Sequence, residues 1–264
     1  MNFPLRFFTP LRLGVRLHLW NSFDSRKGAK PSNERKAVSI TSMRKTFFVI
    51  LIILALVSFG RAQEIPRDSH YPAHWWAPIN DPKKPDWEIL PQEAKRGEVI
   101  LSKRNELGLL SNFAATPFTF RGKRYASLEG FWQAMLYPEG PNDPRAKFAG
   151  LEWKYTREQV TQMTAFEAKH AGDLAEENMR KMKIGWVSFE GKRFAYRPKK
   201  PGRHYHLIVT ATWAKVLQNE DVKKVLLSTG NLILKPDHHQ EPNAPGAWRY
   251  FEIWMRIRKK LQED

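Results

Sequence analysis

A short apolar and polar alternation in the middle of the chain predicts a hairpin that leads into a helix. The residues Phe118-Thr119-Phe120 alternate, Arg121-Gly122-Lys123 is typical of a turn, and Arg124-Tyr125-Ala126 resumes an extended pattern. Ser127 is a suitable N-cap for a helix over 128–137, which Pro138 helps to end. We therefore expect loop, strand, turn, strand and helix in direct succession over residues 110–135.

Helical periodicity dominates the rest of the chain. Thr156 with Gln159 predicts a helix start, and the apolar spacing predicts that this helix continues to near Gly185. Three further helices are expected over 204–217, 221–228 and 247–262, the second of which ends at Thr229-Gly230. The residues expected to face the core are Val160, Met163, Phe166, Ala171, Val209, Trp213, Val216, Leu217, Phe251, Trp254, Met255 and Leu261.

The expected strands are short and do not alternate strictly with the helices. We expect a strand over 98–101, a hairpin over 186–196 and a buried strand over 232–234. No internal repeat is found. This pattern favours a single α+β domain over 98–262 that is mainly helical with short strands.

The segment over 43–62 is typical of a signal peptide. Met43-Arg44-Lys45 is basic, an apolar run follows over 47–59, and small residues precede Gln63. The alternative is an uncleaved membrane anchor, although the run is shorter than a spanning helix prefers. Residues 1–42 are interpreted as a disordered or mis-annotated extension. In both cases the positive-inside rule predicts that the domain lies outside the cytoplasm, secreted or periplasmic, or membrane-anchored.

Residues 63–97 are rich in Pro, Trp and Asp, which excludes a regular helix or central strand. We expect an extended arm that packs against the domain through its aromatic residues. A second interpretation makes Trp75 and Trp76 a stacking platform for a ligand.

The formal net charge of the 264 residues is +17, but the basic excess is uneven. Residues 1–62 contain eleven Lys and Arg against two Asp and Glu, so nine of the seventeen excess positive charges lie there. The charge is thus a weak indication of nucleic-acid binding, and a modest basic surface suits small anionic substrates. The basic run 193–203 is interpreted as a solvated face, with phosphate contacts as the alternative.

Standard catalytic and metal-binding motifs are absent from the sequence, and there is no cysteine. His238 and His239 lie beside Asp237 and Glu241, but neighbouring histidines in a Pro-rich loop are usually solvated, so no metal site is expected. No cofactor is expected either. His170, His204 and His206 are interpreted as surface or helix-end residues.

Glu129 occupies the first turn of the predicted central helix. A carboxylate there complements the positive end of the helix dipole, so its position alone is explained without any catalytic role.

Residues 110–135 also resemble the YbiA-like NADAR family. The shared pattern comprises Ser111-Asn112-Phe113, Pro117-Phe118, Gly122, Tyr125, Ser127, Glu129 and Gln133-Ala134. Further similarity is found over 225–230 and 255–258, so the resemblance spans most of 98–262. It implies a compact α+β fold and hydrolase activity as an N-glycosidase that cleaves the bond between ribose and a base-like nitrogen.

The substrates that the resemblance implies are a riboflavin-intermediate-like nucleotide or ADP-ribosylated guanine, including ADP-ribosylated nucleic acid. Glu129 matches the catalytic carboxylate of the family, which must lie near the anomeric carbon. The residues expected to bind substrate are Asn112, Phe113, Trp132, Gln133, Tyr205, Asp237 and Trp248. No stable membrane partner is expected if the signal segment is cleaved.

The chain departs from the family pattern at several positions. Gly130 replaces a frequent His, Met135 a frequent basic residue, and Asp237 lacks the Trp and Gly that usually accompany a second acid. The alternative function is therefore a nucleotide- or ADP-ribose-binding module that has lost turnover.

Overall fold

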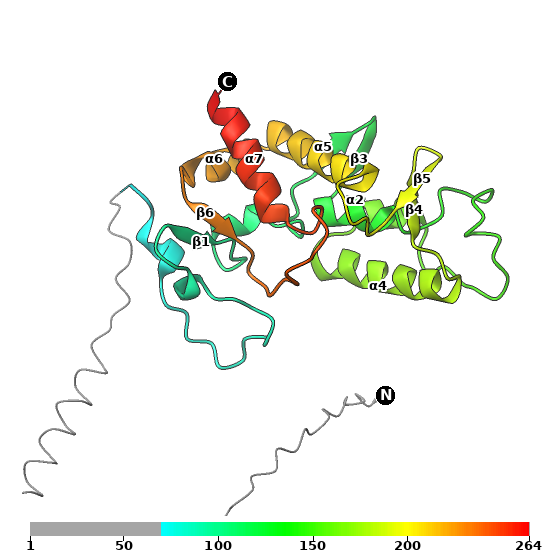
Figure 1. The fold of residues 1–264 in the computed structure, drawn as a ribbon, viewed down its shortest axis with the longest axis horizontal. Coiled ribbons are helices and arrows are strands. Elements are labelled where there is room, and N and C mark those ends of the chain that lie inside the picture. Colours follow the sequence, from blue (N-terminus) through cyan, green and yellow to red (C-terminus); the bar gives the residue numbers. More distant parts are fainter. Residues whose placement is uncertain (1–69, 264) are drawn as a thin grey trace, which may run out of the picture. The chain divides into compact units, whose positions relative to one another are not determined.

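The computed structural model describes residues 70–263, and the expected extension over 1–42 and signal segment over 43–62 lie outside them (Figure 1). The predicted hairpin is confirmed: β2 (Phe118–Phe120) pairs antiparallel with β3 (Lys123–Tyr125). Both turn residues have positive φ, 51° at Arg121 and 75° at Gly122, as a tight two-residue hairpin requires. Helix α2 (Leu128–Ala134) follows, and its cap is confirmed because Oγ of Ser127 accepts from the Gly130 amide at 2.9 Å.

Three two-stranded sheets form within residues 70–263. Besides β2 and β3, strand β1 (Glu98–Ile100) pairs in parallel with β6 (Ile233–Lys235), and β4 (Trp186–Phe189) pairs antiparallel with β5 (Lys192–Ala195). Short strands joined mainly by helices confirm the predicted α+β class.

The prediction of one continuous helix from Thr156 to near Gly185 is wrong, because the first helix ends after about one turn and a second begins at Ala165. Helix α3 (Arg157–Thr161) has the predicted capping box, and α4 (Ala165–Lys181) starts after an extended Thr164. The backbone groups at the break bind elsewhere: Oγ of Ser127 donates to the Met163 carbonyl at 2.8 Å, and the Ala165 amide donates to the Phe113 carbonyl at 3.1 Å. The break therefore ties α4 to the cap of α2 and to the preceding loop.

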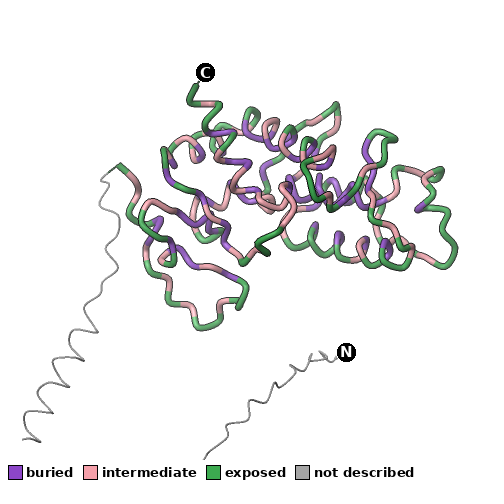
Figure 2. The backbone as a smooth tube through the Cα atoms, viewed as in Figure 1, coloured by how far each residue is buried: buried purple, intermediate pink, exposed green. Residues whose placement is uncertain are grey.

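Helix α2 is the centre of the domain. It packs against α3, α4 and α5 (Arg203–Gln218), and Figure 1 shows it between α4 and α5. Every residue of α2 is buried, whereas α4 alternates between buried and exposed positions (Figure 2). Helices α6 (Glu220–Ser228) and α7 (Tyr250–Glu263) complete the α5 side of the core.

Two residues that periodicity assigned to the core are exposed. Leu217 is 56% exposed and Phe166 is 61% exposed. In α5 the prediction of Val216 is confirmed, whereas Val209 and Trp213 are only partly buried. The other buried apolar positions of α5 are Leu207, Ile208 and Ala211. In α7 the prediction of Trp254 is confirmed, whereas Phe251, Met255 and Leu261 lie at the edge of the core.

The arm contributes two buried tryptophans. Between 3-10 helices η1 (Ala73–Trp76) and η2 (Pro91–Glu93) the chain is irregular, and η3 (Glu106–Leu110) follows β1. Nε1 of Trp75 donates to Glu106 at 2.6 Å, and Nε1 of Trp76 donates to the Glu98 carbonyl at 2.8 Å. Both side chains are almost fully buried and line neither of the two cavities described below, so their interpretation as a ligand platform is wrong. No helix among residues 70–263 is long and apolar enough to cross a membrane.

Candidate active site

A cleft of about 410 Å³ opens beside the first turn of α2. Its walls come from the loop over 111–113, from α2 and α4, from the end of β5 and from the loop before α7. Six of the eight predicted site residues line it, namely Asn112, Phe113, Glu129, Trp132, Gln133 and Trp248. Segments far apart in the sequence therefore meet at the carboxyl that the sequence singled out.

Glu129 is the acid at the base of this cleft. Its backbone amide donates to the Asn112 carbonyl at 2.9 Å, which fixes the first turn of α2 against the loop. Its side chain is buried, and Oε1 accepts one hydrogen bond from Nε2 of Gln133 at 2.7 Å. It forms no ion pair within residues 70–263. Burial raises the pKa of Glu129, and the hydrogen bond from Gln133 and the charge of Lys169 oppose that shift only in part.

The amide side chains beside Glu129 have unused acceptors. Oδ1 of Asn112 and Oε1 of Gln133 are both buried and accept no hydrogen bond in the described part of the chain. A buried carbonyl oxygen without a donor costs free energy, so each is a candidate to receive a ligand hydroxyl. Together with Glu129 they form a cluster of acceptors suited to sugar hydroxyls.

Glycines make room for this cluster. A Cβ at Gly172 of α4 would lie 1.9 Å from Oε1 of Gln133, so only glycine leaves space for that amide. A Cβ at Gly130 would lie 2.6 Å from the Met163 carbonyl and 2.9 Å from the Val160 carbonyl. Glycine at position 130 therefore has a packing reason, the close approach of α2 to the break between α3 and α4.

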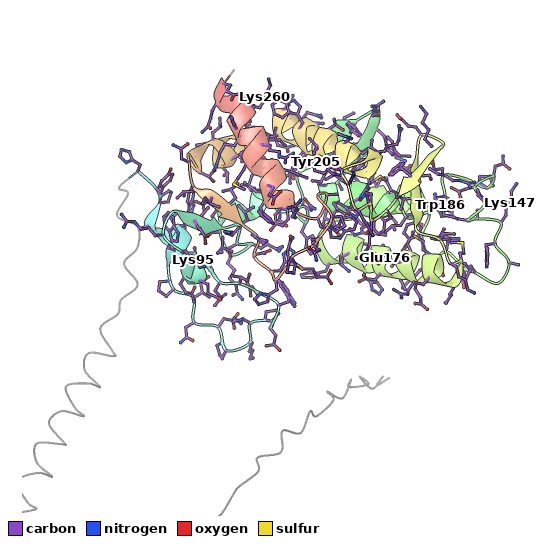
Figure 3. All side chains as sticks on the ribbon, in the orientation of Figure 1. Lys95, Lys147, Glu176, Trp186, Tyr205 and Lys260 are labelled. Carbon is purple, nitrogen blue, oxygen red and sulfur yellow. The ribbon has the colours of Figure 1, made fainter. Side chains whose placement is uncertain are left out.

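Aromatic rings form one wall of the cleft. The rings of Trp132 and Trp248 meet edge to face at 4.8 Å, and Tyr196 lies 5.1 Å from Trp248. Nε1 of Trp132 donates to Oη of Tyr196 at 3.0 Å, and that hydroxyl lies 3.1 Å from Glu176, which Figure 3 places on α4. These bonds fix the ring orientations, so the wall presents a rigid surface for a planar base.

His204 supports the aromatic wall from behind. It lies at the start of α5, one of the two positions expected for it, but it is fully buried and not at the surface. Its ring lies 4.8 Å from Trp132 and 5.4 Å from Trp248. Neither ring nitrogen has a hydrogen-bond partner in the described part of the chain. Burial lowers the pKa of His204 to about 3, so the imidazole is neutral at physiological pH.

The rim of the cleft is partly apolar. The ring of Phe113 meets that of Phe166 at 5.1 Å, and Trp87 of the arm lies 6.3 Å from Phe166. Nζ of Lys103 lies 5.2 Å from the centre of the Phe113 ring. The exposure of Phe166 thus places a ring at the entrance of the cleft instead of in the core.

Each cation that lines the cleft has a carboxylate partner. Lys103 pairs with Asp237, Lys169 with Asp173, and Nη2 of Arg197 lies 3.7 Å from Glu176. The Lys169 pair is exposed and lies one helical turn apart on α4, so it exchanges partners at little cost. A ligand phosphate has cations within the cleft, although none of them is unpaired.

Asp237 and Tyr205 do not line the cleft. Asp237 is buried behind it, where it pairs with Lys103 and Nδ1 of His238 lies 3.0 Å from Oδ1. Burial alone would raise the pKa of Asp237, but the contact with His238 and the charge of Lys103 lower it overall. Tyr205, on α5 in Figure 3, instead accepts a hydrogen bond from Arg256 at 2.7 Å. Asp237 therefore reaches the cleft through lining residues that contact it: Lys103, His238 and Tyr250, whose hydroxyl lies 3.5 Å from Oδ1 of Asp237.

Several lining residues were not identified from the sequence. Tyr196 and Arg197 fall in the basic run for which phosphate contacts were an alternative, but a solvated face was preferred. The residues with no recognisable signal are Trp87, Lys103, Phe166, Lys169, Asp173 and Glu176. Four of these lie on α4. The break between α3 and α4, which the sequence did not predict, lets α4 run along the cleft. Among residues 70–263 no cluster of His, Asp and Glu is arranged to hold a metal ion.

The geometry defines a class of site, an open cleft in which one buried carboxyl lies beside two amide acceptors and an aromatic wall. A scan against protein-family models and a search of curated proteins gave no match for this chain. Among solved structures, it is similar to the E. coli protein YbiA, determined by NMR, with a TM-score of 0.39 and 20% identity. That similarity covers 63% of this chain and 86% of the other.

Proposed function

We propose that this protein is an N-glycosidase that hydrolyses the bond between ribose and a base-like nitrogen, with Glu129 as its catalytic carboxylate. The observation that carries the proposal is the state of Glu129: buried, held by one amide and free of any ion pair in the described residues, in a cleft with unused acceptors. Buried acids with a raised pKa and few partners are typical of catalytic sites.

The proposed reaction uses each wall of the cleft. The base stacks on the Trp132 and Trp248 wall, and the ribose hydroxyls donate to Asn112 and Gln133. The C1′–N bond breaks with its electron pair remaining on the base nitrogen, which takes up a proton, and water adds to C1′. The carboxylate of Glu129 stabilises the positive charge that develops on the ribosyl ring and accepts one proton of the water. It releases that proton to solvent, from which the base nitrogen takes one up, so the carboxylate is regenerated.

The proposed substrate is a riboflavin-intermediate-like nucleotide or ADP-ribosylated guanine, free or in nucleic acid. Phosphate groups on such a substrate would pair with the side chains of Lys103, Lys169 and Arg197, which line the cleft. Because a raised pKa brings Glu129 nearer to neutral pH, it is a stronger base than an ordinary glutamate once it is ionised.

A second candidate function is a nucleotide- or ADP-ribose-binding module without turnover. The observation that favours it is the position of Asp237, the weak candidate for a second acid, which is locked behind the cleft by Lys103. Such a module would use the same aromatic wall and amides for binding.

One experiment separates the two. The protein is incubated with nucleosides, nucleotides and ADP-ribosylated guanosine, and the released base is followed by chromatography while binding is measured by calorimetry. Base release supports the N-glycosidase. Binding without base release supports the module, and the absence of both contradicts the two proposals together.

A further inference from the structure

Helix α2 borders a second cavity, of about 240 Å³, which we call the arginine pocket. Its apolar lining includes Phe131 and Ala134 of α2 and Met135, which follows that helix directly. Glu129, Trp132 and Gln133 of the same helix line the cleft instead. The two cavities therefore share a helix and no lining residue.

Arg157 brings a half-buried positive charge to the arginine pocket. Nε donates to the Tyr137 carbonyl at 3.1 Å, and Nη2 donates to the carbonyls of Met135, Tyr137 and Ser188 at 2.8–3.1 Å. Nη1 donates to no acceptor among residues 70–263, and the guanidinium forms no ion pair with any carboxylate there. Burial lowers the pKa of Arg157 to about 10, and the charge of Glu139 opposes that shift only in part.

Tyr125 adds a second free donor. It is only 4% exposed, and its ring packs against Phe131 at 5.0 Å and Phe118 at 5.7 Å. Its hydroxyl forms no hydrogen bond within the described residues, although it lines the pocket. Burial raises the pKa of Tyr125 to about 12, so the hydroxyl keeps its proton and remains a donor at neutral pH.

The other charged groups of the pocket are Arg121, Lys123, Glu139 and Glu190. Both carboxylates already have partners: Glu139 accepts from the Gly191 amide at 3.0 Å, and Glu190 lies 3.6 Å from Arg121. Glu139 acts on Arg157 through its charge without forming an ion pair. The two groups of the pocket without a hydrogen-bond partner in the described residues are Nη1 of Arg157 and the hydroxyl of Tyr125, and both are donors. The lining has three basic and two acidic side chains, so its net charge is positive.

We propose that the arginine pocket binds a small organic oxyanion. Its oxygens accept from Nη1 of Arg157 and from the hydroxyl of Tyr125, and its apolar or aromatic body packs against Phe131, Met135 and Phe189. The oxyanion is a phosphate or a carboxylate, since both accept charge-assisted hydrogen bonds from a guanidinium. The proposal is independent of Glu129 and of the reaction in the cleft.

The test is calorimetry on the full chain with phenyl phosphate, benzoate and inorganic phosphate. Phenyl phosphate or benzoate identifies which oxyanion fits, and inorganic phosphate is expected to bind more weakly because it has no body to pack. Tyr125→Phe removes the free hydroxyl and keeps the ring, so we expect the Kd to rise about three- to tenfold. Glu139→Gln removes a nearby negative charge, so we expect the Kd to fall about two- to fivefold.

Two controls separate binding from structure. The Tyr125 hydroxyl lines the pocket and forms no hydrogen bond within the described residues, so ligand-free Tyr125→Phe is expected to melt close to the wild-type temperature. Glu129→Gln, in the cleft, is expected to leave the Kd unchanged. The proposal is overturned if neither aromatic probe binds, if Tyr125→Phe binds as tightly as wild type, or if Glu129→Gln alone abolishes binding.

Discussion

Glu129 and Asp143 are both buried carboxyls, and their surroundings are opposite. Glu129 accepts one hydrogen bond from an amide side chain and faces a cleft. Asp143 accepts from the backbone amides of Glu139 and Arg145 at 3.0 and 2.9 Å and pairs with the Arg145 guanidinium at 2.8 Å. Although burial alone would raise the pKa of Asp143, the hydrogen bonds from Arg145 lower it to about 2, whereas burial raises that of Glu129.

This contrast separates a structural acid from a functional one. The lone pairs of Asp143 are used within the protein, and Arg145 in turn holds the Met135 and Leu136 carbonyls after α2. Glu129 and its neighbours Asn112 and Gln133 keep acceptors free at a cost in stability. A ligand in the cleft can form hydrogen bonds with these unused acceptors, whereas the carboxyl of Asp143 has none to offer.

The largest expected effect is on stability at Asp143. Asp143→Asn leaves the guanidinium of Arg145 buried without its counterion, so we expect the free energy of unfolding to fall by about 3–5 kcal/mol. Urea denaturation measures this change. A loss below about 1 kcal/mol would show that the pair is not the structural element described here.

A smaller effect is expected at Gly172. Gly172→Ala forces the Gln133 amide away from Glu129, so a hydrogen bond worth about 1.5–3 kcal/mol is lost, offset by up to about 1 kcal/mol of helix propensity. We expect a net loss of about 1–2 kcal/mol together with weaker ligand binding in the cleft. Gly140→Ala is the matched control, because a Cβ there meets no atom within 4 Å. Equal ligand binding by the two variants would contradict the role given to Gln133.

The smallest expected effect is a gain in stability at Glu129. Its folded pKa is raised, so its ionisation destabilises the fold fully above that pKa and not at all below the unfolded pKa of about 4.3. Glu129→Gln is expected to stabilise the protein by about 1 kcal/mol at pH 7, and the gain should vanish as the pH falls below about 4. Thermal unfolding across pH measures it.

Asp143 supplies the opposite sign for the same pH series. Its folded pKa of about 2 lies below the unfolded value, so its stabilisation is present above about pH 4 and is lost as the pH falls toward 2. The difference between wild type and Asp143→Asn should therefore shrink in acid. If the stability differences of the Glu129 and Asp143 variants from wild type changed with pH in the same direction, the contrast between the two carboxyls would be contradicted.

The sequence predicted the elements that depend on local chemistry. The turn at Arg121 and Gly122, the Ser127 cap and the box at Thr156 follow from backbone preferences of neighbouring residues, and the structure has all three. The break before α4 was missed because Met163 and Ala165 are held by Ser127 and Phe113, contacts that no local pattern contains.

The same limit applies to the candidate site. The residues of the central motif were placed in the cleft because Asn112, Glu129 and Gln133 lie on one loop and the helix that it contacts. Lys103 and Trp87 reach it through tertiary packing, and the burial of His204 depends on rings from three separate segments. Such side chains carry no signal in a single sequence.

The most direct measurement of the central claim is the rate of base release by wild type and Glu129→Gln under the same conditions, on whichever ribosylated base the wild type cleaves. Both proteins are first shown to be folded by thermal unfolding. We predict that kcat/KM falls at least about 100-fold in the variant, because the positioned carboxylate contributes that much to such a reaction. Equal rates in the two folded proteins would contradict the assignment of Glu129 as the catalytic carboxylate.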